Sequence, residues 1–259
     1  MFKVVIPARY ASTRLPAKAL LDIGGKPMLQ WVIAAASRSH ADEVLVATDD
    51  ERVAAIALDE QGRSVAVMTS AEHPSGTDRI AEVAAQRGWP DRTIVVNVQG
   101  DEPQLPPALI EQVAGLLEQH ADADIATLCT PIVSLHEFLD PNVVKVVTAR
   151  GSEALYFSRA PIPWHRDGAA QGLSSQTSIL GAQRHPGIYA YRVGSLRKLT
   201  ALPPSDLELT EKLEQLRALQ AGMRIVVGIA STQPPAGVDT ESDLARVRSL
   251  VAGATGAKG

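Results

Sequence analysis

Apolar residues follow two different rhythms along the first half of the chain. Short runs of apolar and β-branched residues, which are typical of buried strands, end in loops rich in glycine, proline and aspartate. Between them, apolar residues recur every three or four positions, and this spacing predicts amphipathic helices. The alternation of strand and helix predicts a parallel, doubly wound α/β sheet. The predicted strands are 2–6, 43–48, 64–69 and 93–98, and the predicted helices are 27–39, about 50–61, a segment from about 78, and 106–119.

The pattern changes character after about residue 130. No interdomain linker is evident, so we predict one domain over residues 1–259, with one half from 1 to about 130 and a smaller β-rich lobe from about 131 to 250. The predicted elements of the lobe are strands at 124–131, 187–191 and 224–230, a hairpin with arms 143–149 and 154–158, a mobile loop at 167–183, helices at 205–219 and 241–251, and a disordered tail at 252–259.

Composition narrows the classes of partner. The net charge of −4 argues against a general nucleic-acid or anionic-membrane surface. Cys129 is the single cysteine, so an intrachain disulfide or a cysteine-based zinc site is not expected, and its apolar surroundings indicate a core position. The N-terminus does not look like a signal peptide, and no apolar run approaches the length of a membrane helix. We therefore expect a cytoplasmic protein.

Three cations are set into the loop that follows the first predicted strand. Arg9, Arg14 and Lys18 are spaced four to five residues apart, which allows several cations to converge on one anion. Guanidinium and ammonium groups both suit phosphate oxygens. Ligands of open α/β sheets bind outside the carboxyl ends of the strands, so we interpret this loop as a polyphosphate site. A solvated loop with ordinary surface cations is the alternative.

Two further loops carry polar side chains just before predicted helices. The first, from His73 to Arg79, places exposed amides at a helix start, where they could bind phosphate or the edge of a base, although an ordinary helix cap is the alternative. The second follows the strand at 93–98 and contains Asp101 and Glu102. A carboxylate at that position needs a cation or a metal, and adjacent carboxylates suit magnesium, with Asp101 favoured as the ligand.

Asp239, in a turn before the last helix, offers a second carboxylate far away in the sequence. If Asp101 and Asp239 meet at the crevice beside the cationic loop, they could share magnesium ions next to a triphosphate. Carboxylates that hold magnesium beside cations that hold a triphosphate are typical of nucleotidyl transfer, in which metal ions neutralise the charge that develops on phosphate. For Asp101, a cap of the helix predicted at 106–119 is the structural alternative.

Nine segments, spread in order over nearly the whole chain, carry a resemblance to a known family: IPARYASTRLPAKAL, GGKPM, HPSGTDR, NVQGDEP, VKVV, YFSRAPIPW, HPGIYAYR, LEQLR and GVDTESDL. With these segments the chain resembles the 3-deoxy-manno-octulosonate (Kdo) cytidylyltransferases, also called CMP-Kdo synthetases. The resemblance implies a Rossmann-like α/β fold of the nucleotide-diphospho-sugar transferase type, with a mostly parallel mixed sheet and a smaller β-rich lobe for sugar binding and dimerisation.

The resemblance also implies an activity: CTP and Kdo would give CMP-Kdo and diphosphate with magnesium, supplying lipopolysaccharide synthesis, and the enzyme would be a homodimer. Catalytic roles would fall to Lys18, Asp101 and Asp239, and the last two would hold the metal. Nucleotide binding would involve Ala8, Arg9, Ala11, Arg14, Lys18, Ser75, Gly76, Thr77, Asp78 and Arg79. Sugar binding would involve Gln99, Arg159, His185, Tyr189 and Glu214. Arg159 suits the sugar carboxylate and the others suit hydroxyls.

Three other functions stay open at this point. A cytidylyltransferase acting on sialic acid would share the nucleotide half, so only the second lobe separates the two. A nucleotide-sugar glycosyltransferase would carry an Asp-x-Asp signature, whereas this chain has Asp101-Glu102-Pro103. An inactive nucleotide-binding regulator would bind CTP without turnover. No side chain stands out as a dedicated base for the sugar hydroxyl, so we expect the metal to assist its deprotonation.

Overall fold

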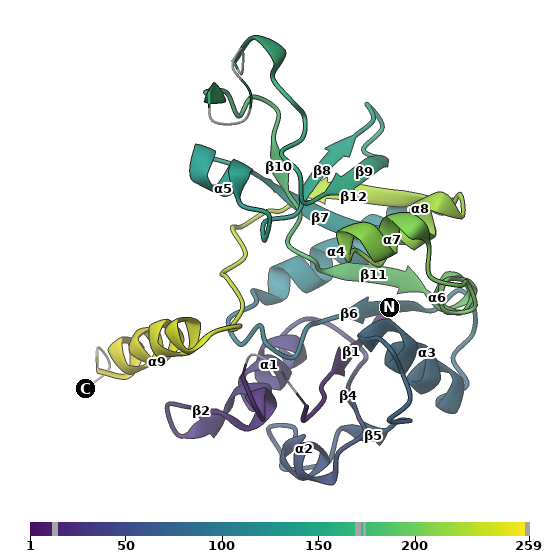
Figure 1. Ribbon diagram of the computed structural model, residues 1–259. Coiled ribbons are helices and arrows are strands. Elements are labelled where there is room, and N and C mark those ends of the chain that lie inside the picture. Colours follow the sequence, from purple (N-terminus) through teal and green to yellow (C-terminus); the bar gives the residue numbers. More distant parts are fainter. Residues whose placement is uncertain (12–14, 169–171, 173–174, 257–259) are drawn as a thin grey trace.

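The structure, a computed structural model, describes residues 1–11, 15–168, 172 and 175–256 (Figure 1). The four parallel strands predicted in the first half are all present. A short hairpin of β2 (Asp22–Ile23) and β3 (Lys26–Pro27) follows the cationic loop. The parallel strands are β1 (Phe2–Pro7), β4 (Glu43–Thr48), β5 (Ala66–Met68) and β6 (Ile94–Asn97).

Strands from the second half extend this sheet. The main sheet runs in the order β5-β4-β1-β6-β11-β7, so β11 (Tyr189–Arg192) lies antiparallel between β6 and β7 (Ile125–Pro131). β12 (Ile225–Ile229) pairs in parallel with the other edge of β7. The insertion of β11 brings the residues before Tyr189 to the carboxyl end of β6, because the register pairs Tyr189 with Asn97.

The second lobe closes a ring of strands above the main sheet (Figure 1). β7 pairs with β10 (Gln183–Arg184), which pairs with β8 (Lys145–Thr148), which in turn pairs with β9 (Ala154–Ser158). The ring returns to β12 through a bridge from Glu153 to Val226 and a 2.8 Å hydrogen bond from the Val227 amide to the Ser152 carbonyl. The hairpin predicted from the sequence is therefore one side of this ring.

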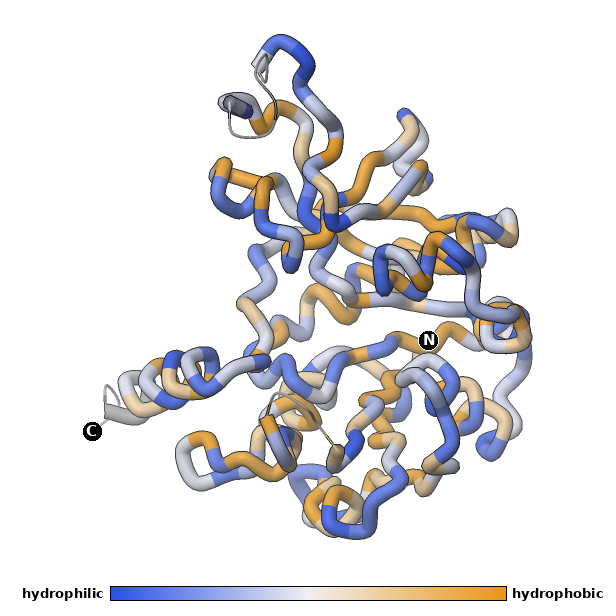
Figure 2. Tube along the Cα trace, in the orientation of Figure 1, coloured by the Kyte–Doolittle hydropathy of each residue, from blue (hydrophilic) through white to orange (hydrophobic). Residues whose placement is uncertain are grey.

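Helices cover both faces of the sheet. One face packs against α1, α2 and α4, and the other packs against α3, α6 and α8, which gives three layers. Figure 2 shows the apolar residues concentrated along the strands and the inner helix faces. The helices are α1 (Met28–Ser37), α2 (Glu51–Ile56), α3 (Gly76–Gln86), α4 (Pro107–Gln119), α5 (Leu135–Leu139), α6 (Val193–Thr200), α7 (Asp206–Glu211), α8 (Gln215–Gln220) and α9 (Glu241–Gly256), with short 3-10 turns at Lys18–Leu20 and Arg166–Gly168.

The single helix predicted over 205–219 is wrong. A capping box of Ser205 and Glu208 starts α7, but Lys212 adopts a left-handed conformation with φ 54° and ends it. α8 then begins after Glu214. Leu209 is 52% exposed, although one continuous helix would place it on the same face as the buried Leu213 and Leu216. After the break, Glu214 contacts Thr77 at the start of α3.

Several smaller predictions also differ from the structure. α2 ends at Ile56 rather than near residue 61, and a turn bridging Leu58 and Ser64 follows it. Residues 252–256 of the expected disordered tail continue α9, while 257–259 lie outside the described residues. Part of the expected mobile loop at 167–183 also lies outside the described residues, and the described Gln176 is buried. α5 and α6 are helices that the sequence patterns did not predict.

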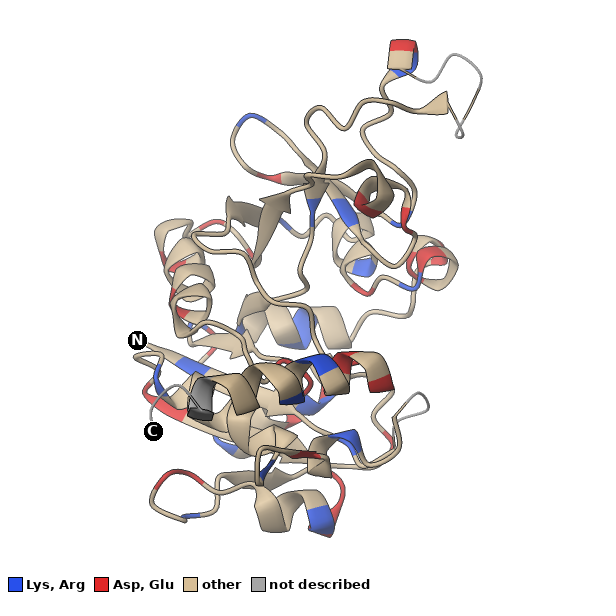
Figure 3. Ribbon diagram, turned by 90° about the vertical axis from the view of Figure 1, so that its left-hand side faces the viewer, with Lys and Arg blue, Asp and Glu red and all other residues tan. Residues whose placement is uncertain are grey.

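Charges of both signs alternate over the helices and loops in the view of Figure 3, and no broad basic face is visible there. No helix among the described residues is long and apolar enough to cross a membrane.

Lys145 holds the second lobe together from inside. Its side chain is fully buried on β8, and its Nζ donates hydrogen bonds to three backbone carbonyls, those of Asp140 at 2.9 Å, Val143 at 2.6 Å and Arg159 at 2.7 Å. Burial lowers the pKa of Lys145, while the acidic groups Asp140 and Glu211 oppose that change. The Lys145 ammonium thus provides a hydrogen-bond donor for three carbonyls that lie outside the strands.

We expect Lys145→Met to lower the free energy of unfolding by about 2–4 kcal/mol, because the partly buried carbonyls of Val143 and Arg159 lose a charged donor, although the Asp140 carbonyl keeps the Val143 amide. Urea denaturation measures the change, and Lys198→Met, at an exposed position of α6, is the matched control. Equal losses in the two variants would contradict the role assigned to Lys145.

Candidate active site

The loop after β1 fits against two glycines at the carboxyl edge of the sheet. A Cβ on Gly76, the first residue of α3, would lie 3.1 Å from the Pro7 side chain, and one on Gly100 would lie 3.1 Å from the Pro7 carbonyl oxygen. Ala8 is buried and its amide donates to the Ala47 carbonyl at 2.9 Å. The backbones around Pro7, Gly76 and Gly100 therefore converge where ligands of parallel sheets bind.

Lys18 joins three segments that are far apart in the sequence. Its Nζ donates to Asp101 Oδ2 at 2.7 Å, to Asp239 Oδ1 at 2.9 Å and to the Val238 carbonyl at 2.9 Å. The Val238 amide in turn donates to the Asp101 carbonyl at 2.9 Å. The carboxylates of Asp101 and Asp239, which the sequence places far apart, therefore accept hydrogen bonds from the same ammonium group.

The last helix keeps Asp239 in this position. Val238 just before it and Leu244 and Val247 on α9 are buried in a small apolar cluster with Leu15 and Met28 from the N-terminal region. This cluster lies outside the main core and attaches the end of the chain to the loop that carries Lys18. Asp239 is therefore placed by packing of α9 rather than by the sheet.

The charges at this site influence one another. Burial works to lower the pKa of Lys18, but the charge and hydrogen bond of Asp101, together with those of Asp239, outweigh it and raise that pKa. Burial and the Asp101 charge raise the pKa of Glu102 to about 8, with Arg184 opposing. The site therefore gathers more acidic groups than one lysine balances, so it favours additional cations.

Magnesium prefers oxygen ligands, so the carboxylates of Asp101 and Asp239 are candidate ligands for it. Within the described chain, no three His, Cys, Asp or Glu side chains are grouped so that they could hold a metal ion. Magnesium usually binds through one or two carboxylates together with substrate phosphates and water. Asp101 and Asp239 supply two carboxylates that already share one cation, so the donor set fits magnesium only in the company of phosphate oxygens.

The predicted nucleotide loop forms the start of α3. Ser75 is its N-cap and accepts a hydrogen bond from the Asp78 amide at 3.2 Å, while its hydroxyl donates to the Asp78 carboxylate at 2.6 Å. The Thr77 hydroxyl donates to Glu214. The helix start thus contacts the second lobe directly. Arg9 and Ala11 are exposed on the loop after β1, and Arg14 lies outside the described residues.

The Arg79 side chain is engaged in internal contacts. Its guanidinium is buried and donates to Asp49 at 2.6 Å, to the Thr69 hydroxyl at 2.8 Å and to the Ser70 carbonyl at 3.1 Å. These contacts hold α3 against the ends of β4 and β5. The predicted contact of Arg79 with the nucleotide stays a prediction, and its guanidinium already has three partners within the protein.

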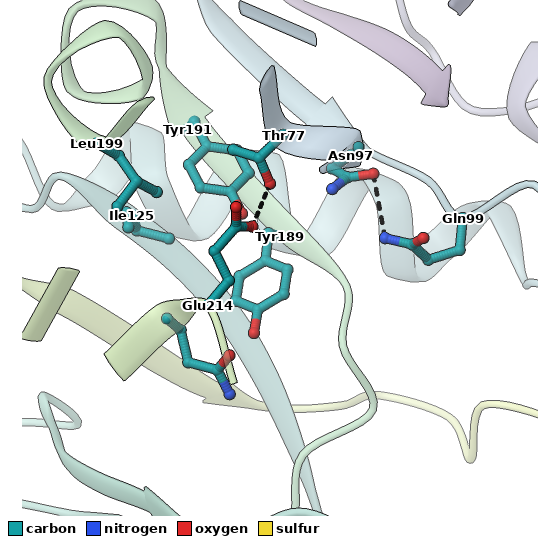
Figure 4. A pocket seen from close by; sticks show the side chains of 10 residues that line it. Thr77, Asn97, Gln99, Ile125, Tyr189, Tyr191, Leu199 and Glu214 are labelled. Atoms are coloured by element: carbon teal, nitrogen blue, oxygen red, sulfur yellow. Dashed lines mark hydrogen bonds between the residues drawn. The ribbon is translucent and has the colours of Figure 1, made fainter. Parts of the chain in front are cut away.

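A first pocket of about 130 Å³ lies between the sheet and the helices α3, α6 and α8 (Figure 4). Thr77 and Glu214 point toward each other in it, and Gln99 donates to Asn97 at 3.3 Å. Burial raises the pKa of Glu214, although the hydroxyls of Thr77 and Ser75 and the charge of Arg217 oppose it. The lining residues are Gly76, Thr77, Asn97, Gln99, Ile125, Tyr189, Tyr191, Leu199, Glu214 and Gln215.

A second pocket of about 280 Å³ adjoins the first, because Tyr189 and Gln215 line both. His185 lies in its wall, buried against Phe157 at 4.9 Å and Tyr189 at 5.1 Å between ring centroids. Burial lowers the pKa of His185 to about 3, so the ring is neutral at physiological pH. The lining residues are Asn142, Val143, Val144, Arg184, His185, Pro186, Gly187, Tyr189, Leu213 and Gln215.

The two pockets thus bring together four of the five predicted sugar-binding residues: Gln99, His185, Tyr189 and Glu214. Arg159 lines neither pocket. Its guanidinium donates to the Glu211 carbonyl at 2.7 Å and the Pro141 carbonyl at 3.0 Å. The guanidinium in the second pocket belongs to Arg184, which also lies 3.4 Å from Glu137.

Sequence reasoning missed several of the lining residues, although some left a signal. Tyr191 follows Tyr189 by two positions on one strand, so the two side chains share a face. Asn97 is a polar residue inside an apolar strand, which usually marks a functional position or a specific partner. Arg184 and Gln215 each adjoin a predicted ligand, but nothing in the local pattern showed that they face the pockets.

The chain is similar in sequence to known cytidylyltransferases. A family model described as cytidylyltransferase matches residues 3–225. The 3-deoxy-manno-octulosonate cytidylyltransferase of Thioalkalivibrio sulfidiphilus is 56% identical over 250 residues, which cover 96% of this chain and 98% of that protein. The protein of the same name from Nitrosococcus oceani is 56% identical over 252 residues, which cover 96% of each.

Solved structures agree with these relatives. A structure of CMP:2-keto-3-deoxy-manno-octonic acid synthetase complexed with CTP matches with a TM-score of 0.85 and 41% identity, over 97% of this chain and 99% of that one. A cytidylyltransferase from Leptospira borgpetersenii shares the fold, with a TM-score of 0.61 and 16% identity over 97% of this chain and 86% of that one. The chain belongs to the 3-deoxy-manno-octulosonate cytidylyltransferase family.

Proposed function

We propose that this protein transfers the cytidylyl group of CTP to Kdo, giving CMP-Kdo and diphosphate. The observation that carries the proposal is the meeting of Asp101 and Asp239 on Lys18, at the sheet edge from which Gln99 enters a polar pocket. The near-full-length relatives named for this activity support the choice of nucleotide and sugar.

The proposed reaction is an in-line displacement at the α-phosphorus of CTP. The oxygen of the Kdo 2-hydroxyl forms a bond to the α-phosphorus of CTP, and the bond from that phosphorus to the α,β-bridging oxygen breaks. Diphosphate leaves and the hydroxyl proton is lost. The protein's task is to hold the attacking oxygen and the phosphorus in contact and to balance negative charge on the phosphates.

We divide this task between the two halves of the chain. The backbone around Ala8 and the start of α3 would hold the cytosine and ribose, with Arg9 and Lys18 near the phosphates; the same role is proposed for Arg14, which lies outside the described residues. Asp101 and Asp239 would hold magnesium, which supplies charge neutralisation and eases deprotonation of a bound hydroxyl. Lys18 carries three N–H donors beside both carboxylates, and such donors suit phosphate oxygens.

The sugar would occupy the paired pockets. Gln99 and Glu214 offer hydrogen bonds in the first pocket, and His185 offers one in the second, which suits a substrate with many hydroxyls. The sugar carboxylate needs a cation, and Arg184 in the second pocket and Arg159 beside it are the two candidates. Both guanidiniums have partners within the protein, Glu137 for Arg184 and two backbone carbonyls for Arg159, and we favour Arg184 because it lines the pocket and Arg159 does not.

We further propose that the enzyme works as a homodimer in the cytoplasm and supplies CMP-Kdo for lipopolysaccharide synthesis. The second lobe carries the exposed apolar side chains of Val133, Leu155, Trp164 and Leu180, from which a contact with a second copy could draw.

The direct test measures diphosphate release from each of the four nucleoside triphosphates, with Kdo and with sialic acid. We expect release with CTP and Kdo in the presence of magnesium, and little with sialic acid. Comparable release with sialic acid would reassign the sugar, and an absence of release despite CTP binding would favour a regulator.

Asp101→Asn should lower kcat by at least about 100-fold, because it removes a charge that organises the reacting phosphates while keeping the side-chain shape. Steady-state kinetics at several magnesium concentrations measure the effect. Asp91→Asn is the control, since Asp91 is an exposed carboxylate paired with Arg197. A kcat near the wild-type value would refute the metal assignment.

Arg184→Gln should raise the KM for Kdo about tenfold or more and leave the KM for CTP unchanged, because a lost charge-assisted hydrogen bond costs about 1.5–3 kcal/mol. Arg159→Gln is the companion variant in the same assay. If only Arg159→Gln weakens the use of Kdo, the carboxylate belongs to Arg159 instead.

A further inference from the structure

Thr127 is a polar residue in the middle of the buried strand β7. Its side chain is fully buried, and strand pairing places it between Tyr189 of β11 and Val227 of β12. A buried hydroxyl requires hydrogen-bond partners. Thr127 finds two of them outside its own strand: its Oγ1 lies 2.6 Å from the Ile188 carbonyl oxygen and 2.9 Å from His185 Nε2.

These two contacts determine where the imidazole proton resides. A carbonyl oxygen can only accept, so the single hydroxyl proton of Thr127 is donated to Ile188. Oγ1 is then left to accept, and His185 Nε2 must be the donor. A neutral imidazole carries one N–H, so a ring with its proton on Nε2 presents Nδ1 as an acceptor.

The surroundings of the imidazole oppose a ring flip, which would exchange the positions of Nδ1 and Nε2. Phe157 packs edge-on against the imidazole, Tyr189 covers it at a tilt, and the His185 amide donates to the Val144 carbonyl at 2.8 Å. Among the described residues, none forms a hydrogen bond with Nδ1, and His185 lines the second pocket. The acceptor is therefore available to a ligand there.

We propose that Thr127 is a positioning residue, which holds His185 with its proton on Nε2 so that Nδ1 accepts a hydrogen bond from a hydroxyl of the acidic sugar. This inference rests on the proposed function and deepens it. An acceptor at this point attracts a hydroxyl and repels a carboxylate oxygen. The sugar is thus oriented with a hydroxyl toward His185 and its carboxylate toward the guanidinium side of the pocket.

The test begins on the wild-type protein, for which no variant has to fold. Long-range ¹H–¹⁵N NMR distinguishes the two tautomers, and the spectrum of His185→Gln assigns the signal among the six histidines. We expect a proton on Nε2 and a change in the Nδ1 chemical shift when Kdo is added. A proton on Nδ1, or an Nδ1 signal unchanged by saturating Kdo, would overturn the proposal.

Variants then separate positioning from packing. Thr127→Val keeps the shape but removes the hydroxyl, so it should mix the tautomers and raise the KM for Kdo about tenfold, with the KM for CTP unchanged. Thr127→Ser should restore both properties. Thr130→Val is the matched control on the same strand, because the buried Thr130 hydroxyl has no hydrogen-bond partner among the described residues.

The two levels of failure can be told apart. Wild-type protein that releases no diphosphate from CTP and Kdo would refute the proposed function, whereas the tautomer of His185 is observed without turnover. An active wild type combined with a Thr127→Val variant of unchanged tautomer and unchanged KM for Kdo would refute the positioning role alone.

Discussion

One ammonium group ties together the beginning, the middle and the end of the chain. Lys18 donates to Asp101, to Asp239 and to the Val238 carbonyl, and no strand of the sheet could join these segments directly. Two carboxylates so close to each other would repel without a cation between them. The site is therefore built around a requirement for positive charge, and this requirement explains why α9 has to pack beside the first loop.

A second constraint couples the two regions proposed to bind substrates. Thr77, at the start of the helix proposed to hold the nucleotide, donates directly to Glu214, which lines the first of the pockets proposed for the sugar. Glu214 reaches that place only because Lys212 breaks the chain between α7 and α8. The local irregularity in the second lobe thus has a physical purpose, since a continuous helix would leave the carboxylate elsewhere.

The sequence carried enough information for the sheet and for the acidic pair, but not for every ligand. β4 matches its predicted bounds because both of its faces are buried, Val46 on one side of the sheet and Leu45 and Ala47 on the other. Asp101 and Asp239 were identified because loops after strands and before helices limit where they can lie. The left-handed Lys212 left no signal, since lysine does not favour that conformation. Arg79, Arg159 and Arg184 look alike in sequence and all have internal partners, and only packing decides that Arg184 also lines a pocket.

The wall that Tyr189 and Gln215 share between the two pockets has a consequence for how this site can change. A smaller side chain at either position would widen both pockets at once, whereas exchanges at the residues that line only one pocket would alter that pocket alone. Tyr189 and Gln215 are therefore the positions at which the shapes of the two pockets are coupled.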